Sequence, residues 1–379
     1  MPTNELIIEG KVRILNRLGN KEVFYNPKAE LTRTLGVLFV YVEGKIKDDA
    51  IVISDPLAAT GIRGIRYAVE SQCVKRVLFN DKSRLAYKII RKNVQINNIE
   101  EISQVGNVDA NVFLYSHFDE CDFIDVDPFG SPSPFIDSAV SAVRNQGVVA
   151  ITSTDLAPLC GLYTKAALRK YGSLPVHTEY CHEVAVRILI KELLRAAGRH
   201  FKYGDLLSSH VLGQYGRVYM RISRGKLKYR DEYIGYIIHN YTSGEIITVS
   251  MRNLTLLKEY LSKNDKIVVS GPLWIGPLHD CNYIKKMKNI LLKNNLFSEK
   301  KTQQLVKYLN MFIEENDFPP FYYNFHVACK KLKKSPPSIN EVIDALRARG
   351  FQATRTHFSR FGIKTTADYN SFLDTLRGI

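Results

Sequence analysis

The sequence predicts an α/β fold in which a domain built on a parallel sheet is followed by a smaller α+β domain. Between residues 50 and 225, short β-rich apolar runs alternate with helix-length amphipathic stretches, as in a parallel sheet covered by helices. A length of 379 residues exceeds what one domain usually holds. A basic, glycine-containing stretch, Ser223 to Arg230, marks the change of pattern, so we place the domains at 1–225 and 226–379.

The predicted elements of the first domain alternate between strand and helix. The strands are Ala50 to Ser54, Arg76 to Phe79, Gln104 to Asn107, Phe123 to Val126 and Gly147 to Thr152. The helices are Ile62 to Ser71, Lys82 to Asn97, Pro134 to Val143 and His182 to Ala197.

The second domain reads as a mixture of helices and aromatic segments. Helices are predicted over Leu254 to Leu261, Ile284 to Leu292 and Thr302 to Glu315. After two prolines, Ser338 and Glu341 have the spacing of a capping box that begins a further helix.

Composition and charge narrow the class of protein. The chain is 45% hydrophobic and 24% charged, and it has no apolar run of about 18 residues, which favours a cytoplasmic protein without a membrane span. Its six cysteines form no C-x2-C pair, so we expect free thiols and no metal site. The net charge of +15 favours a polyanionic partner. Residues 226–379 carry most of the excess, with 24 Lys and Arg against 14 Asp and Glu.

The first predicted strand runs into a loop suited to a nucleotide-like ligand. Small and flexible residues from Asp55 to Gly64 lead into a helix, whose N-terminus attracts a ligand. The three-glycine spacing of dinucleotide sites is missing, which favours a cofactor without a pyrophosphate. Arg63 supplies a cation for a carboxylate. The alternative is a tight turn that binds nothing.

Acidic residues follow the next two strands. Asp81 can accept both hydroxyls of a ribose, although a role as the N-cap of the following helix is equally compatible with its position. Asp109, at the end of the third strand, can accept an adenine amino group beside the small Ala110. Three strand ends in this order favour a nucleoside-containing cofactor.

The fourth strand ends in Asp127-Pro128-Phe129-Gly130, at the edge where α/β folds place their ligand crevice. Methylating an aromatic exocyclic amine requires an acceptor that holds its N–H bonds, and Asp127 fits that need. Pro128 fixes the backbone, and Phe129 offers a face for a base to stack on. The alternative is an ordinary turn. Asp155, after the fifth strand, either lines the same pocket or caps a helix.

These motifs together resemble the tRNA (guanine-26-N2)-dimethyltransferase family of archaea and eukaryotes. The resemblance runs nearly from end to end, and the order of its segments is specific. The segments are Phe24 to Arg33, Leu57 to Arg66, Asp125 to Ser131, Thr152 to Gly161, His182 to Ile188, Ser270 to Leu278 and Thr354 to Thr365.

The resemblance implies a class I (Rossmann-like) methyltransferase domain and a family-specific C-terminal domain that binds tRNA. It implies transfer of two methyl groups in succession from S-adenosylmethionine to the N2 amine of guanine 26, with Asp127 as the catalytic residue. The implied cofactor contacts are Arg33, Arg63, Asp81, Asp109 and Ala110, and the implied base pocket is formed by Phe24, Asn26, Pro128 and Phe129.

The chain departs from the family in one segment. Some relatives carry cysteine pairs just before the Ser270 to Leu278 motif, whereas His239 to Val269 has no cysteine here, so no zinc subsite is predicted. In the basic C-terminal domain, phosphate contacts are expected from two groups of residues. One is the run Lys330, Lys331, Lys333 and Lys334, and the other is Arg355, His357, Arg360 and Lys364.

Three other functions are compatible with parts of the sequence. A DNA or protein amine methyltransferase is the first, because similar tetrapeptides serve other amino groups. A catalytically idle RNA-binding protein is the second, although the intact Asp127 and the acidic strand ends oppose it. A nicotinamide-dependent dehydrogenase is the third, and its glycine spacing is missing.

Overall fold

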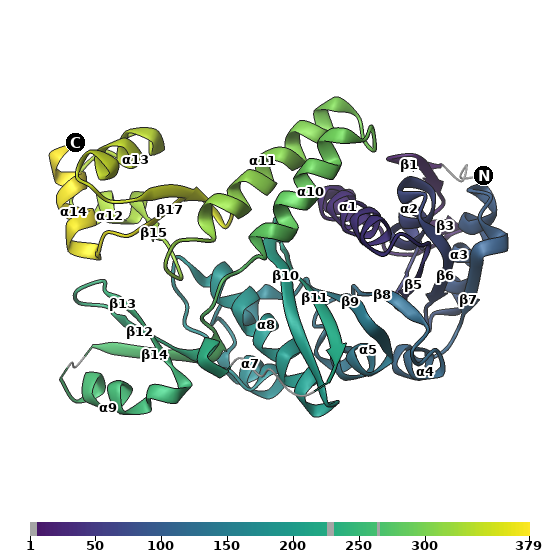
Figure 1. The fold of residues 1–379 in the computed structure, drawn as a ribbon, viewed down its shortest axis with the longest axis horizontal. Coiled ribbons are helices and arrows are strands. Elements are labelled where there is room, and N and C mark those ends of the chain that lie inside the picture. The colour runs from purple at the N-terminus through teal and green to yellow at the C-terminus, as the bar shows by residue number, and fades with distance from the viewer. Residues whose placement is uncertain (1–5, 226–230, 264–265) are drawn as a thin grey trace.

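The computed structural model describes residues 6–225, 231–263 and 266–379. Its centre is a seven-stranded sheet with helices on both faces (Figure 1), which confirms the predicted α/β class. The strand order is β10-β11-β9-β8-β5-β6-β7, in which β5 to β9 are parallel and β11 is antiparallel to both neighbours. The strands are β5 (Ile51–Asp55), β6 (Val74–Asn80), β7 (Ser103–Gly106), β8 (Cys121–Val126), β9 (Val143–Ser153), β10 (Lys202–Leu212) and β11 (Tyr215–Arg224).

The strand order determines where a ligand can bind. The chain proceeds from β5 outward through β6 and β7, then returns to the other side of β5 with β8. At such a reversal the loops after the two central strands diverge, which leaves a crevice outside their carboxyl ends. The loops after β5 and β8 carry the two motifs singled out in the sequence.

Helices cover both faces of the sheet. Figure 1 shows α1 and α2 on one face and α4, α5 and α8 on the other. Val37 and Phe39 of α1 are buried in a core on one face, and Val140 of α5 and Ile188 of α8 are buried in a core on the other. The helices are α1 (Glu30–Lys47), α2 (Ile62–Ser71), α3 (Arg84–Ile96), α4 (Ala110–Ser116), α5 (Ile136–Ala142), α6 (Leu156–Leu159), α7 (Thr164–Tyr171) and α8 (Cys181–Arg199).

A small N-terminal unit precedes α1. Its strands are β1 (Ile7–Glu9), β2 (Val12–Ile14), β3 (Arg17–Leu18) and β4 (Lys21–Glu22), paired as two antiparallel hairpins. Buried Val12 and Ile14 pack with Ile65 of α2 and Ile90 of α3, so this unit is anchored on the helices beside the crevice.

The second half forms two lobes and one helical pair. The first lobe is an antiparallel sheet of β12 (Ile234–Asn240), β13 (Ile246–Ser250) and β14 (Ile267–Trp274), with α9 (Leu254–Lys263). The second lobe contains β15 (Tyr323–Asn324), β16 (Ala353–Thr356), β17 (Ser359–Thr365), α12 (Phe325–Lys331), α13 (Ile339–Ala348) and α14 (Tyr369–Gly378). The pair is α10 (Cys281–Lys293) and α11 (Glu299–Glu315). Residues 226–230, within the predicted boundary stretch, lie outside the described residues.

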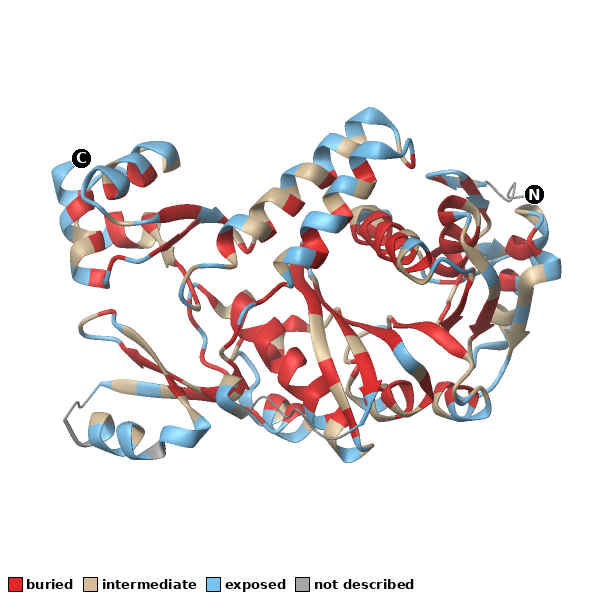
Figure 2. Ribbon diagram, viewed as in Figure 1, coloured by how far each residue is buried: buried red, intermediate tan, exposed pale blue. Residues whose placement is uncertain are grey.

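The helical pair joins the second half to the large sheet. Tyr283 of α10 and Phe312 of α11 are buried in the same hydrophobic cluster as Phe39 of α1 and Tyr219 of β11. The rings of Phe39 and Tyr219 stack with centroids 3.6 Å apart. Figure 2 shows this continuous buried zone around the large sheet, whereas the lobe of α12 to α14 has a separate core.

The cysteine-free segment His239 to Val269 contains much of the first lobe. Its sheet packs through Ile237 and Leu273 against the core that contains α8, so apolar contacts hold the segment to the rest of the fold. None of the helices in the described ranges combines the length and the apolar character that a membrane span requires.

Candidate functional site

A cavity of about 390 Å³ lies where the loops after β5, β6 and β8 meet. All ten residues that the sequence assigned to the cofactor, to catalysis or to the base line this one cavity, although they come from six separate segments of the chain. These residues are Phe24, Asn26, Arg33, Arg63, Asp81, Asp109, Ala110, Asp127, Pro128 and Phe129.

The loop between β5 and α2 forms the floor of the cavity. Gly61 adopts φ +79°, a left-handed conformation that glycine tolerates at the start of a helix. A Cβ atom added at Gly64 would collide with the ring of Phe79, so this glycine allows α2 to pack closely on β6. The two glycines therefore allow a tight turn and close packing of α2 on β6, and the residues between them and β5 line the cavity.

Asp81 connects two of the loops around the cavity. One carboxylate oxygen accepts a hydrogen bond from the backbone N–H of Ala59 at 3.0 Å, and the other from that of Ser83 at 2.8 Å. The side chain that caps α3 is Ser83, so the N-cap role considered for Asp81 is wrong. Asp109 lines the cavity and also caps α4, with a 2.9 Å bond from the N–H of Asn111.

Asp127 is held by a buried cation. The Nε atom of Arg63 donates to Oδ2 of Asp127 at 3.0 Å, and a second guanidinium nitrogen donates to the same oxygen. Burial disfavours the charged carboxylate, but Arg63 and then Arg217 outweigh it and lower the pKa of Asp127. Asp127 is therefore an ionised acceptor facing the cavity, with its side chain 24% exposed.

A network of buried charged and polar side chains lies next to the ion pair of Arg63 and Asp127. Asp125 is fully buried and accepts hydrogen bonds from Tyr67 and, at 2.6 Å, from Arg217. Asp55, also buried, lines the cavity, and burial together with the negative charge of Asp125 raises its pKa to about 8. Asp55 is consequently mostly protonated at pH 7, which limits the negative charge under the cavity to the amount that the arginines balance.

Two exposed aromatic side chains stand at the mouth of the cavity. Phe129 is 89% exposed and Phe24 is 59% exposed, and their rings meet edge to face with centroids 5.5 Å apart. Beside them, the amide of Asn26 donates to the hydroxyl of Tyr215 at 2.6 Å. Large exposed rings at a cavity mouth are suited to stacking on a planar ligand.

Arg33 is the most constrained of the predicted cofactor residues. Its guanidinium forms a two-pronged ion pair with Glu9 and donates to the carbonyl of Asn26 at 2.9 Å. This arrangement fastens the N-terminal unit over the cavity.

Sequence reasoning missed several lining residues. Tyr215 and Gln214 come from the β10–β11 hairpin, which was not predicted, and Asp55 was considered only as part of its loop. Asp155 fills neither of the roles proposed for it. Its side chain makes no cap bond, and it pairs with Lys170 at 3.5 Å.

The predicted phosphate contacts in the last lobe divide into two groups. The Lys364 ammonium is buried and pairs with Glu183 at 3.0 Å, and the ring of His357 is buried against Glu315. Both predictions of phosphate contact are therefore wrong, because neither side chain reaches the surface. Arg355 and Arg360 are exposed, as are the lysines of the run, Lys330, Lys331, Lys333 and Lys334.

His279, Glu315 and His357 form a buried cluster between the helical pair and the last lobe. His357 Nδ1 and Glu315 are in direct hydrogen-bond contact, which is too close for a metal between them. The N–H of Val211 donates to His357 Nε2 at 3.3 Å, so the proton of a neutral ring sits on Nδ1 and is donated to Glu315. The cluster is therefore a hydrogen-bonded link between parts of the fold.

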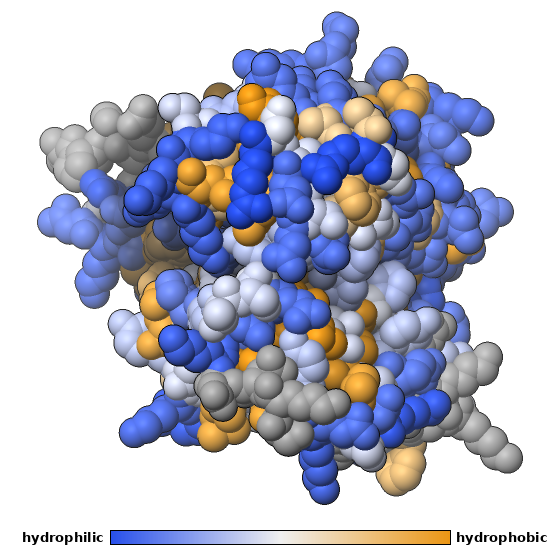
Figure 3. All heavy atoms as spheres, turned by 90° about the vertical axis from the view of Figure 1, so that its left-hand side faces the viewer, coloured by the Kyte–Doolittle hydropathy of each residue, from blue (hydrophilic) through white to orange (hydrophobic). Residues whose placement is uncertain are grey.

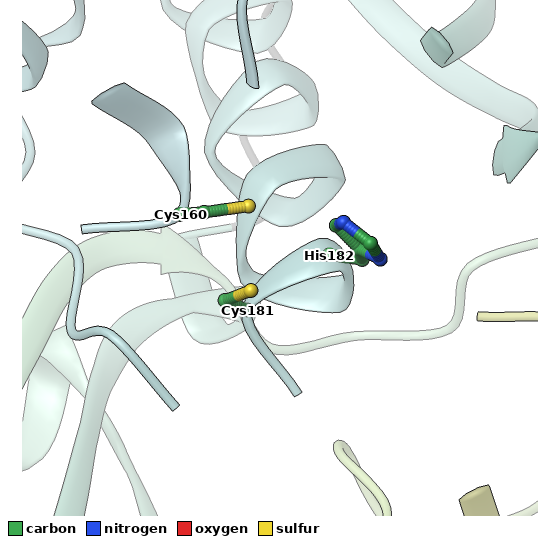
Figure 4. A group of neighbouring side chains, drawn as sticks. All are labelled: Cys160, Cys181 and His182. Atoms are coloured by element: carbon green, nitrogen blue, oxygen red, sulfur yellow. The ribbon is translucent and has the colours of Figure 1, made fainter. Parts of the chain in front are cut away.

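A second cluster joins the loop after α6 to the start of α8. The sulfur atoms of Cys160 and Cys181 and a ring nitrogen of His182 lie within 4.8 Å of one another (Figure 4). A hydrogen bond from the Cys160 thiol lowers the pKa of Cys181 to about 7, against an opposing effect of burial. Such a set can bind a thiophilic cation or be oxidised to a disulfide, and all six cysteines are free here. This cluster was not predictable from the sequence, because 20 residues separate the two cysteines.

Comparison with known proteins assigns the chain to a family. A family model described as N2,N2-dimethylguanosine tRNA methyltransferase matches residues 5–377. The chain belongs to this family. Two relatives are tRNA (guanine(26)-N(2))-dimethyltransferases, one from Methanothermobacter thermautotrophicus at 35% identity over 94% of this chain and 93% of its own length, and one from Pyrococcus furiosus at 34% identity over 97% of each.

A solved structure supports the same assignment at the level of the fold. The complex of Trm1 from Pyrococcus horikoshii with S-adenosyl-L-methionine has a TM-score of 0.84 and 33% identity, covering 98% of this chain and 99% of that one. The resemblance found in the sequence and the class I methyltransferase fold are thereby confirmed.

Proposed function

We propose that this chain transfers two methyl groups in succession from S-adenosylmethionine to the N2 amine of guanine 26 in tRNA. The observation that carries the proposal is the position of Asp127, an ionised acceptor facing a cavity whose mouth bears two exposed aromatic rings. Family membership supports the choice of substrate and cofactor.

The cavity residues fit the proposed cofactor. A volume of about 390 Å³ lies within the range of small-molecule sites. Asp81 and Asp109 offer acceptors for ribose hydroxyls and an adenine amine, and Ala110 leaves room for the ring beside them. When bound, S-adenosylmethionine supplies an electrophilic methyl group on a positively charged sulfur.

Arg63 and Arg33 are the residues that can contact the carboxylate of the cofactor. Both guanidinium groups already hold carboxylates of the chain, Asp127 and Glu9 respectively. Each can add a contact to the cofactor carboxylate while it keeps its partner, because a guanidinium has five N–H donors. Arg63 therefore links cofactor binding to the orientation of Asp127.

Asp127 acts on the amine of the target base. The lone pair of that nitrogen is delocalised into guanine, and a carboxylate that accepts an N–H bond favours the pyramidal form that attacks the methyl carbon. Its lowered pKa keeps it ionised at pH 7, so that both oxygens can accept hydrogen bonds, and makes it a weak base. Orientation and charge stabilisation are therefore its main contributions. A monomethylated amine keeps one N–H, so the same acceptor orients it again.

The target guanine must leave the base stack of the tRNA before its amine can reach the carboxylate of Asp127. Phe129 and Phe24 give the extruded guanine a stacking surface at the cavity mouth, which offsets part of the cost of unstacking. Asn26 and Pro128 shape the wall beside it. Selectivity for guanine then rests on polar groups within reach of the base edge, which include the hydroxyl of Tyr215.

The net charge of +15 supports binding of tRNA through phosphate contacts. In the last lobe, Arg355 and Arg360 remain candidates because both are exposed. Figure 3 shows this end of the molecule covered mostly by hydrophilic side chains, with smaller apolar patches between them.

The direct test is nucleoside mass spectrometry of unmodified tRNA incubated with the protein and isotope-labelled S-adenosylmethionine. We expect labelled dimethylguanosine, which disappears when the guanine at position 26 is replaced by adenine. Methylation that persists in the replaced tRNA refutes the assigned position. Methylation of DNA or protein in place of tRNA refutes the assigned substrate.

A further inference from the structure

The segment 161–171 lies directly beside the catalytic loop. It follows α6, contains α7, and is tied at its end to the residues just after the Asp127 tetrapeptide. The hydroxyls of Tyr171 and Ser131 are 2.6 Å apart, and the hydroxyl of Ser133 donates to the carbonyl of Lys170 at 2.8 Å. The position of α7 is therefore coupled to the loop that carries Phe129.

The two faces of α7 differ in burial. Ala167 and Tyr171 are buried, and they lie four residues apart on the inner face. Tyr163, at the N-terminal end of the helix, is 64% exposed, and Lys165 and Arg169 are exposed on its outer side. These three residues line one open depression. Lys165 and Arg169 are one helical turn apart, so their side chains project from the same face at a spacing of about 6 Å.

The outer face of α7 combines positive charge with exposed apolar groups. We define this α7 face by Leu162, Tyr163, Lys165, Leu168 and Arg169. Within the described part of the chain, neither Lys165 nor Arg169 takes part in an ion pair. The segment 161–171 contains three cations and no acidic residue.

We propose that the α7 face binds the RNA strand next to the extruded nucleotide, with Lys165 and Arg169 on phosphates and Tyr163 stacked on an unpaired base. The inference rests on the proposed function, because it assumes that the target base enters the cavity beneath Phe129. The nucleotides that flank this base leave the cavity mouth where Phe129 is exposed, and α7 borders the same loop.

The chemistry of the α7 face favours RNA over a protein partner. A ring with its polar hydroxyl, set among cations, is the combination that binds single-stranded nucleic acid. A second copy of this chain carries the same net charge of +15, which opposes self-association through a basic face. The α7 segment is also hydrogen-bonded to the residues that follow the catalytic loop, where the flanking nucleotides leave the cavity.

Two sets of variants test the proposal through tRNA affinity measured across a salt series. For the double variant Lys165→Ala with Arg169→Ala, we expect the Kd for tRNA to rise roughly tenfold at 0.1 M salt and the slope of log K against log salt to flatten by about 1.4, the value for two phosphates of a single strand. For Tyr163→Ala we expect a rise of about fivefold or more with an unchanged slope.

The controls separate charge, fold and function. Lys285→Ala with Lys286→Ala removes two exposed cations from α10, on the opposite side of the large sheet (Figure 1), and should leave affinity within about twofold. The exchange Lys165→Arg with Arg169→Lys keeps both charges and should restore binding. Melting temperatures of all variants should match that of the wild type, because the substituted side chains are exposed.

The outcomes distinguish this inference from the proposed function. If the wild type dimethylates guanine 26 while the double variant keeps its Kd and salt slope, the assignment of the α7 face is overturned and the function stands. If affinity falls without a change of slope in the double variant, the phosphate contacts are overturned. If the wild type methylates no tRNA, the proposed function fails, whatever the α7 variants show.

Discussion

Replacing Lys364 by alanine should destabilise the fold and leave the salt dependence of tRNA binding unchanged. The Lys364 ammonium is buried and lies 3.0 Å from Oε1 of Glu183. Removing one partner of a buried ion pair costs about 3–5 kcal/mol, because the other charge stays desolvated. Glu183 keeps Arg187 at 2.7 Å and the N–H of Phe321 at 2.8 Å, so the lower end of that range applies.

That free energy converts to a measurable shift in melting temperature. The unfolding entropy is about 2.1 cal/mol/K per residue, or roughly 0.8 kcal/mol/K for 379 residues that unfold together. A loss of about 3 kcal/mol, at the lower end of that range, then lowers Tm by about 4 °C. Differential scanning calorimetry at pH 7 measures this shift, and salt titrations of tRNA binding measure the charge effect.

Two further variants make the interpretation unambiguous. Lys364→Met keeps most of the aliphatic volume, so a similar Tm loss assigns the effect to the missing charge and not to a cavity. Arg355→Ala, at an exposed position of the same lobe, should leave Tm within about 1 °C. An unchanged Tm for Lys364→Ala together with a flatter salt slope would show that this lysine contacts phosphate, and would refute the buried pair.

Three other predictions follow from the site and from the buried clusters. Burial lowers the pKa of His279 to about 4. The free energy of unfolding is therefore highest above pH 6.5 and falls by about 3 kcal/mol as the pH decreases towards 4. The pKa of Glu315 is also lowered, which adds to the loss below pH 4.5. Urea midpoints between pH 7.5 and pH 5 should therefore decline in the wild type and decline less in His279→Gln, and equal slopes would contradict the reasoning. Phe129→Ala should lower kcat/KM for tRNA by roughly 5- to 100-fold and leave S-adenosylmethionine binding intact, and an unaltered kcat/KM would exclude a stacking role. The alkylation rate of Cys181 should rise with increasing pH, with a midpoint near pH 7. Burial raises the pKa of Cys329, so its alkylation rate should rise only above pH 9. A midpoint near pH 9 at Cys181 would show that its thiol is unperturbed.

The parallel strands of the central sheet and the loops that follow them were predictable because their signals are local in the sequence. Each of the five predicted strands is present, and α2 spans the predicted Ile62–Ser71. The capping box of Ser338 and Glu341 also forms as predicted, with both of its reciprocal hydrogen bonds. Seven of the ten predicted residues follow parallel strands, which bring their carboxyl ends to a single edge of the sheet. The other three, Phe24, Asn26 and Arg33, reach the same cavity from the N-terminal segment and α1, and only the family resemblance indicated them.

The missed elements are those whose stability depends on distant contacts. The strand β10 contains the buried polar residues Ser208, Ser209 and His210, which interrupt the pattern of apolar residues that would predict a strand. Their hydrogen bonds and ring contacts include Ser208 to His279 at 2.8 Å, far along the chain. The helix α1 is not among the predicted elements, because only its first turn belongs to the motif Phe24 to Arg33, although it carries the buried surface on which α10 and α11 pack.

The same limit explains the errors among the basic residues. A sequence shows that Lys364 and His357 are near other cations, and charge alone favours the surface. Their partners, Glu183 and Glu315, lie 181 and 42 residues away, so the ion pairs that bury them appear only in three dimensions. Arg355 and Arg360 have the same basic character in the sequence as Lys364, but their side chains are exposed.

The central claim is that a single carboxylate in the cavity, Asp127, orients the amine that accepts the methyl group. Single-turnover transfer to tRNA, measured for the wild type and for Asp127→Asn with S-adenosylmethionine binding followed by calorimetry, tests it most directly. We predict a fall in the transfer rate of at least about 100-fold while cofactor binding remains measurable. A variant that transfers methyl groups at nearly the wild-type rate would contradict the account.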